Sequence, residues 1–132
     1  MDIKYNEATN NRPEGNRIID APFVFIDTAE YYRQLTQEDA WHKNDRNGIT
    51  LFKGEGQTIV LTAFHAGAEL HANEVKGIIT IQVMEGLLTF LLGGEEFTLK
   101  PGNVVALHPN LKHSLLAKDD SLVMITTNLH NN

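Results

Sequence analysis

Turn signals recur from Gly48 onward, and most of them are eight to twelve residues apart. They are Gly54-Glu55-Gly56, Ala66-Gly67-Ala68, Glu85-Gly86, Gly93-Gly94, Pro101-Gly102 and Lys118-Asp119-Asp120. The segments between them are short and apolar, such as QTIVLTAF and NVVAL. Short strands cut by turns at this spacing predict an antiparallel all-β sandwich or barrel. No long helical pattern follows Trp41, so a parallel α/β sheet is excluded.

The segment before Gly48 has a different character. Residues 1–17 are polar, and because they contain too little apolar surface to offset their ordering entropy, we expect a flexible N-terminal segment. Ile18–Ile26 (IIDAPFVFI) is rich in β-formers and apolar on both faces, which predicts a strand. Asp27 and Glu30 then form a capping box that predicts a short helix ending near Leu35.

Length and composition restrict the class of protein. With 132 residues the chain fits one domain, and its net charge of −6 gives no electrostatic footprint for nucleic acid or an anionic membrane. The absence of cysteine excludes disulfides, thiolate nucleophiles and Cys-based metal sites. No segment has the apolar character of a signal peptide or a membrane span, so we expect a cytoplasmic protein without a membrane partner.

Glycines and histidines between Gly67 and His113 carry a recognisable spacing, most specific in the phrases QVMEG and GGEEFTLKPGNVVALHPNLKHSL. This pattern resembles the cupin superfamily of RmlC-like, cupin_2-type barrels, and the resemblance covers about residues 46–127. It implies an antiparallel jelly-roll β-barrel with a short N-terminal strand and helix. Residues 18–132 would then form a single cupin domain with its barrel core at about 46–127.

The first cupin motif is retained only in part. Gly67, His71 and Gly86 fit the pattern, which has a Gly, two histidines separated by one residue, a Glu and a closing Gly. Asn73 stands where the second histidine belongs. Counting back from the closing Gly places Ile79 at the Glu, whereas counting forward from Asn73 gives Gly77 or Ile78, and neither count finds a carboxylate. The sequence therefore lacks two of the metal ligands that the resemblance implies.

The second motif shows a similar mixture of retained and changed positions. Gly102 and His113 fit the motif. His108 occupies the position of its usual Pro, Asn110 that of its Gly and Ala117 that of its Asn. Asn110 is a mild change, because asparagine tolerates the left-handed conformation that a glycine would supply.

The metal site that the resemblance implies would use three histidines and a glutamate around one divalent ion, Fe, Mn, Ni or Zn. His71 and His113 remain as metal ligands, and a third ligand could come from Glu74, Gln82 or His108. Two imidazoles alone leave an ion largely held by water. Gln82 interrupts an apolar run, so it belongs either to the pocket or to the solvent side of the barrel. The predicted pocket residues are His71, Asn73, Gln82, His108 and His113.

Three functional hypotheses follow. The leading one is a binding or sensing module that holds a small-molecule ligand in a mostly apolar barrel, with a degenerate metal site and no assigned catalytic residue. The alternative is a metal-dependent cupin enzyme, an oxygenase or isomerase, using His71, His113 and a non-standard third ligand. The third is an assembly role, because open sheet edges or a donated Ile18–Ile26 strand favour a homodimer.

Overall fold

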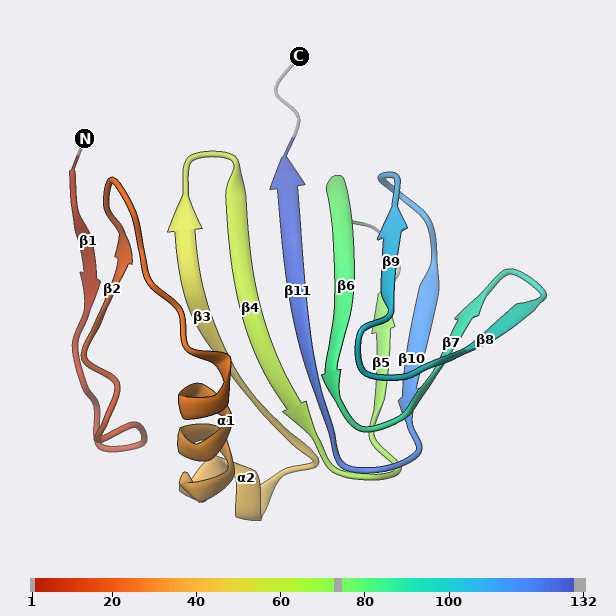
Figure 1. Ribbon diagram of the computed structural model, residues 1–132, viewed down its shortest axis with the longest axis horizontal. Coiled ribbons are helices and arrows are strands. Elements are labelled where there is room, and N and C mark those ends of the chain that lie inside the picture. Colours follow the sequence, from red (N-terminus) through yellow and green to blue (C-terminus); the bar gives the residue numbers. More distant parts are fainter. Residues whose placement is uncertain (1, 73–74, 130–132) are drawn as a thin grey trace.

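Two antiparallel sheets face each other and form the body of the protein (Figure 1). The structure is a computed structural model that describes residues 2–72 and 75–129. The larger sheet has the strand order β3-β4-β11-β6-β9 and the smaller sheet β5-β10-β7-β8. Their bounds are β3 (Arg46–Gly54), β4 (Gln57–Phe64), β5 (Glu69–Ala72), β6 (Gly77–Glu85), β7 (Leu88–Leu92), β8 (Glu95–Leu99), β9 (Val104–Leu107), β10 (His113–Ala117) and β11 (Ser121–Leu129). The predicted all-β jelly roll is confirmed.

The main core lies between these two sheets. Ile81 and Val83 of β6 contribute from the larger sheet, and Phe90 of β7 and Leu115 of β10 from the smaller one, each with no more than 2% of its surface exposed. Side chains alternate between buried and less buried along β6 and β10, as expected when one face of each strand meets the opposite sheet. Inward-facing positions of this core are therefore almost entirely apolar.

A second core covers the outer face of the larger sheet. Helix α1 (Thr28–Gln37) is capped by Asp27, whose side chain accepts a hydrogen bond from the Glu30 amide at 3.2 Å, so the predicted capped helix is confirmed. Leu35 of α1 and Trp41 of α2 (Asp39–Lys43) pack here against Leu61. No helix in the described ranges is both long and apolar enough to span a membrane.

The predicted strand Ile18–Ile26 is correct only at its beginning. Strand β2 (Arg17–Asp20) pairs with β1 (Lys4–Asn6), and no further strand is formed before α1. Pro22 has no backbone N–H to donate to a ladder, which explains why pairing does not continue through this segment. Val24 and Ile26 are half-buried, whereas Phe23 and Phe25 are exposed.

Basic side chains of the N-terminal segment attach it to the free edge of β3. Arg12 donates to the Gly48 carbonyl at 2.8 Å, Arg17 to the Thr50 carbonyl at 2.9 Å, and Lys4 to the Lys53 carbonyl at 3.3 Å. Burial lowers the pKa of Arg17 from its usual value, and the nearby charge of Arg12 lowers it further. These contacts give residues 2–17 of the segment, which was expected to be flexible, defined polar anchors. Their flexibility stays a prediction.

Candidate functional site

His113 lies at the start of β10 and faces the core between the sheets, with 8% of its surface exposed. Its Nδ1 is 2.9 Å from the Leu111 carbonyl oxygen, and its ring centroid is 5.9 Å from that of Phe90. Because a carbonyl oxygen can only accept, Nδ1 carries the proton, and in the neutral ring Nε2 keeps a lone pair. His113 is thus an oriented imidazole in apolar surroundings.

His71 is not brought together with His113. On β5, His71 pairs with Ser114 of β10, while His113 pairs with Ala72. Neighbouring residues of a strand point to opposite faces of the sheet, so His71 faces away from the core. Its side chain is 65% exposed, and its Nε2 is 3.0 Å from a carboxylate oxygen of Glu69. The structure thus places the two motif histidines on opposite faces of one sheet.

The remaining predicted residues also lie away from His113. Gln82 of β6 pairs with Met124 of β11 and alternates with the inward-facing Ile81, so it faces the outer side of the larger sheet. His108 is exposed directly after β9. Asn73 and Glu74, predicted as a pocket residue and a third ligand, lie outside the described residues. Asn110 has a φ of 66°, which confirms that asparagine serves in the left-handed conformation expected there.

The donor set for a cupin metal ion does not fit among the described residues. Within residues 2–72 and 75–129, no three His, Asp or Glu side chains gather closely enough to hold a metal ion. His113 presents one imidazole to the core, and the inward-facing side chains around it are apolar. Divalent transition metals need several N, O or S ligands for firm binding. The described residues thus provide one inward-facing imidazole, with no cluster of metal ligands around it.

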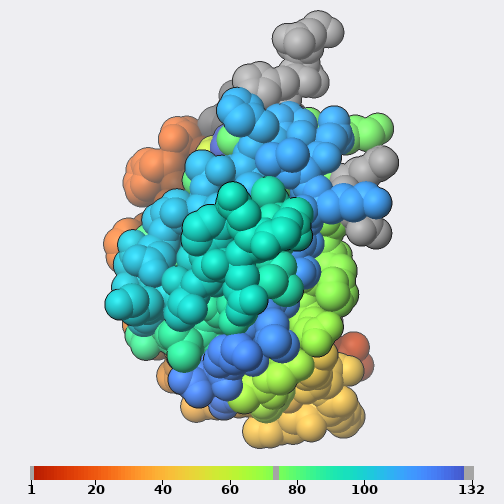
Figure 2. Space-filling model, turned by 90° about the vertical axis from the view of Figure 1, so that its right-hand side faces the viewer, coloured from red at the N-terminus to blue at the C-terminus, as the bar shows by residue number. Residues whose placement is uncertain are grey.

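A groove opens where the two sheets separate, between the edge strands β8 and β9. Its volume is about 600 Å³. In Figure 1 the β7–β8 hairpin diverges from β9, and in Figure 2 the same hairpin, in teal, projects toward the viewer. We name this cavity the β8–β9 groove; its lining is Phe90, Phe97, Thr98, Leu99, Gly102, Asn103, Val104, Val105 and Ala106.

Aromatic residues from two paired strands line the floor of this groove. Phe90 and Phe97 are direct cross-strand partners on the inward face of β7 and β8, with ring centroids 6.3 Å apart. Phe90 is 2% exposed, whereas Phe97 is 49% exposed although it points toward the core side. Val105, paired with the buried Ile81, borders the other side. Inward-pointing residues therefore remain accessible here because β8 and β9 do not pair.

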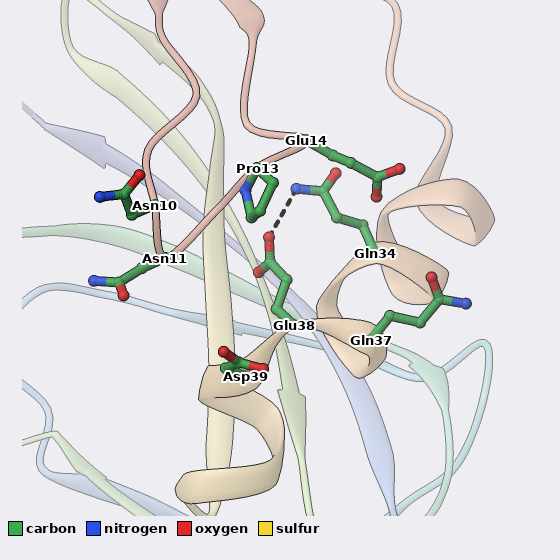
Figure 3. A pocket seen from close by; sticks show the side chains of 8 residues that line it. All are labelled: Asn10, Asn11, Pro13, Glu14, Gln34, Gln37, Glu38 and Asp39. Atoms are coloured by element: carbon green, nitrogen blue, oxygen red, sulfur yellow. Dashed lines mark hydrogen bonds between the residues drawn. The ribbon is translucent and has the colours of Figure 1, made fainter.

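A smaller cavity of about 270 Å³ lies between the N-terminal segment and α1 (Figure 3). Asn10 and Asn11 face it from one side, and Gln34 and Glu38 face it from the other. The Gln34 side-chain amide donates a hydrogen bond of 3.1 Å to the Glu38 carboxylate. Arg12 forms a salt bridge with Glu38 at 3.1 Å and neutralises its charge. The polar groups of Gln34 and Glu38 are thus already paired, and the arrangement is structural.

Sequence reasoning overlooked the β8–β9 groove because it followed the histidines. Phe90 lies in LLTFLL and Phe97 in EEFTL, and period-two alternation in both segments places these residues on one face. A cross-strand aromatic pair was therefore a readable signal. The separation of β8 from β9 could not be read from the sequence, because it depends on where the β7–β8 hairpin diverges from β9.

Comparison with known proteins agrees with this architecture. No family model matches the chain. An RmlC-like cupin from Desulfovibrio desulfuricans is 27% identical with a TM-score of 0.57, covering 63% of this chain and 81% of that one. A cupin superfamily protein from Desulfitobacterium hafniense is 17% identical with a TM-score of 0.63, covering 66% and 80%. A protein of unknown function from Streptococcus pyogenes is 16% identical with a TM-score of 0.63, covering 96% and 98%.

One similarity is to a curated enzyme. The chain is 36% identical over 74 residues to L-ectoine synthase from Hyphomonas neptunium, and this match covers 54% of the chain and 55% of the enzyme. The chain thus spans about half the length of the curated relative it matches. Its facing antiparallel sheets define a small jelly-roll protein. More narrowly, its fold is that of RmlC-like proteins of the cupin superfamily.

Proposed function

We propose that this cupin binds a small, largely apolar organic molecule in the β8–β9 groove and acts as a binding or sensing module. One observation carries the proposal: Phe97 points toward the core side of its sheet yet is 49% exposed beside a cavity of about 600 Å³. Pockets of this size lined by aromatic and aliphatic side chains are typical of small-molecule sites.

The lining suggests the chemistry of the ligand. Phe90 and Phe97 offer a flat apolar surface suited to an aromatic or aliphatic ring. Thr98 and Asn103 provide polar groups at the rim, and the Asn103 side-chain oxygen is already occupied by the Lys100 amide at 2.9 Å. His113 lies behind Phe90 and would accept a hydrogen bond from a group that penetrates between the sheets. A ring with one polar substituent fits this arrangement.

Replacing Phe97 by serine is expected to weaken binding of an apolar probe, anilinonaphthalene sulfonate, by roughly tenfold to a hundredfold. Full burial of a phenylalanine side chain contributes about 1.5–3 kcal/mol, and 1.4 kcal/mol corresponds to a tenfold change in affinity. A fluorescence titration measures this change. Leu91→Ser is the matched control, because Leu91 is 37% exposed on the other face of the adjacent strand β7.

Amide chemical shifts locate the probe independently. On titration, residues of β8 and β9 should shift and those of α1 should not. Equal affinities of the wild type and Phe97→Ser, or shifts confined to another surface, would reject the groove as the binding site.

The match to L-ectoine synthase supports a second candidate, an enzyme that acts on a small molecule in the same barrel. The lone pair on Nε2 of His113 could accept a proton or bind a metal ion there. Elemental analysis of the wild type and of His113→Ala, both purified without added metal, discriminates the candidates. Stoichiometric metal in the wild type that is lost in the variant favours the metal-dependent enzyme; equal metal content in the two proteins favours the binding module.

A further inference from the structure

Four large apolar side chains beside the N-terminal strands are exposed next to one another. Tyr5 and Ile18 are cross-strand partners in β1 and β2, and they are 53% and 46% exposed. Phe23 and Phe25 follow β2 and are 83% and 82% exposed. Ile18, Phe23 and Phe25 share a cavity of about 420 Å³. We name these four residues the N-terminal apolar strip, and its aromatic content is unusual for a free surface.

The main chain next to this strip has no partner within the described structure. No backbone hydrogen bond between described residues involves residues 21–26. Phe23 and Phe25 alternate with the half-buried Val24 and Ile26, which is the period of a strand. Residues 21–26 therefore resemble an edge strand whose N–H and C=O groups have no backbone partner among the described residues; Pro22 has no N–H.

We propose that the N-terminal apolar strip is the interface of a homodimer, in which residues 21–26 of two copies lie antiparallel across a two-fold axis. An antiparallel pair of identical segments has this symmetry by construction, because each residue meets its counterpart in reverse order. The pairing would satisfy the free backbone groups and bury Phe23 and Phe25 together. It gives the predicted homodimer a specific surface.

The exposed area is sufficient for such an interface. At about 200 Å² for a whole aromatic side chain, the exposed fractions of the strip correspond to roughly 500 Å² per copy. Complete coverage of the strips of both copies corresponds to roughly 1,000 Å², the lower bound for a specific protein interface. Exposed phenylalanine and tyrosine are also the residue types enriched at interface centres.

Charge around the strip favours a second copy over a lipid surface. The chain carries a net charge of −6, which opposes approach to an anionic membrane. Exposed charges of both signs border the strip, Lys4 next to Tyr5 and Asp27 directly after residues 21–26. A patch that carries both signs can complement itself across a two-fold axis.

Light scattering coupled to size exclusion tests the proposal. We expect the wild type at micromolar concentration to have twice the mass of the 14.8 kDa chain, and Phe23→Ser/Phe25→Ser to have the mass of one chain. Val104→Ser, at an exposed valine in the β8–β9 groove, should stay dimeric. A monomeric wild type, or a double variant that remains dimeric, would overturn the proposal.

Cysteine cross-linking tests the geometry without relying on the double variant. The chain has no cysteine, so each of Phe23→Cys, Val24→Cys and Phe25→Cys introduces one thiol. A residue close to the two-fold axis meets its own counterpart, and mild oxidation should then give a disulfide-linked dimer at one or two of these positions. Val104→Cys should stay uncross-linked. No cross-link at any of the three positions, or equal cross-linking at Val104, would contradict the arrangement.

Discussion

Replacing Gly86 by alanine is expected to lower the free energy of unfolding by about 3–5 kcal/mol. Gly86 has a φ of 94°, and an added Cβ would fall on the Ser121 hydroxyl and 2.5 Å from the Asp120 carbonyl oxygen. The Ser121 hydroxyl is fully buried and accepts the Leu87 amide at 3.1 Å. Backbone and hydroxyl must both move, so the turn between β6 and β7 would be disrupted. Equilibrium unfolding in urea measures the loss.

Gly102→Ala is the matched control for this substitution. Gly102 has nearly the same φ, 92°, but nothing lies within 4 Å of the position that a Cβ would take. Only the cost of the left-handed conformation remains, about 1–2 kcal/mol. Equal losses for the two variants would show that close packing against Ser121 contributes nothing, and that backbone conformation alone requires glycine at position 86.

The fold could be predicted from the sequence because its determinants are local. Gly54-Glu55-Gly56 and Gly93-Gly94 form the turns of the β3–β4 and β7–β8 hairpins, as their residue types indicate. Asn110 takes the left-handed conformation expected of it. Two or three residues determine the geometry of each turn. The period-two alternation of side chains along the strands between the turns then determines which face of each strand is buried.

The site could not be predicted in the same way because it depends on register and on distances between strands. His71 and His113 both lie on strands that pair, yet Ala72 and not His71 is opposite His113. A shift of one residue reverses the face of every side chain, and spacing in the sequence does not fix it. The groove beside Phe97 likewise arises from the divergence of β8 from β9, which no single segment encodes.

The N-terminal segment illustrates a further limit of reasoning from composition. Residues 1–17 have few apolar side chains, and the entropy argument alone predicts a loose segment. It overlooks Arg12, which donates to both carboxylate oxygens of Glu38 at 3.1 Å and to the Asn47 side chain at 3.2 Å. Buried polar partners far apart in the sequence are not visible in composition, and they attach this segment to α1 and β3.

Replacing Arg12 by alanine is therefore expected to lower the free energy of unfolding by about 2–4 kcal/mol, because a buried charge is left without its partner. The Glu38 side chain is 5% exposed, and Asn47 also donates to it at 3.0 Å. Chemical denaturation measures the loss. Adding Glu38→Gln to Arg12→Ala removes the unpaired charge and should recover part of the lost stability. The effects of the two substitutions on the free energy of unfolding should therefore be non-additive.

Arg33→Ala controls for the loss of an arginine as such. Arg33 pairs with Glu30 at 2.6 Å and with Glu14 at 3.2 Å, but all three side chains are well exposed to solvent. Exposed ion pairs contribute little because water screens them, so the midpoint of unfolding should stay at the wild-type value within error. If Arg12→Ala and Arg33→Ala behaved alike, the Arg12 network would not be the anchor of the N-terminal segment. A larger effect of Arg12→Ala, with recovery by Glu38→Gln, would tie that segment to the stability of the whole barrel through one buried carboxylate.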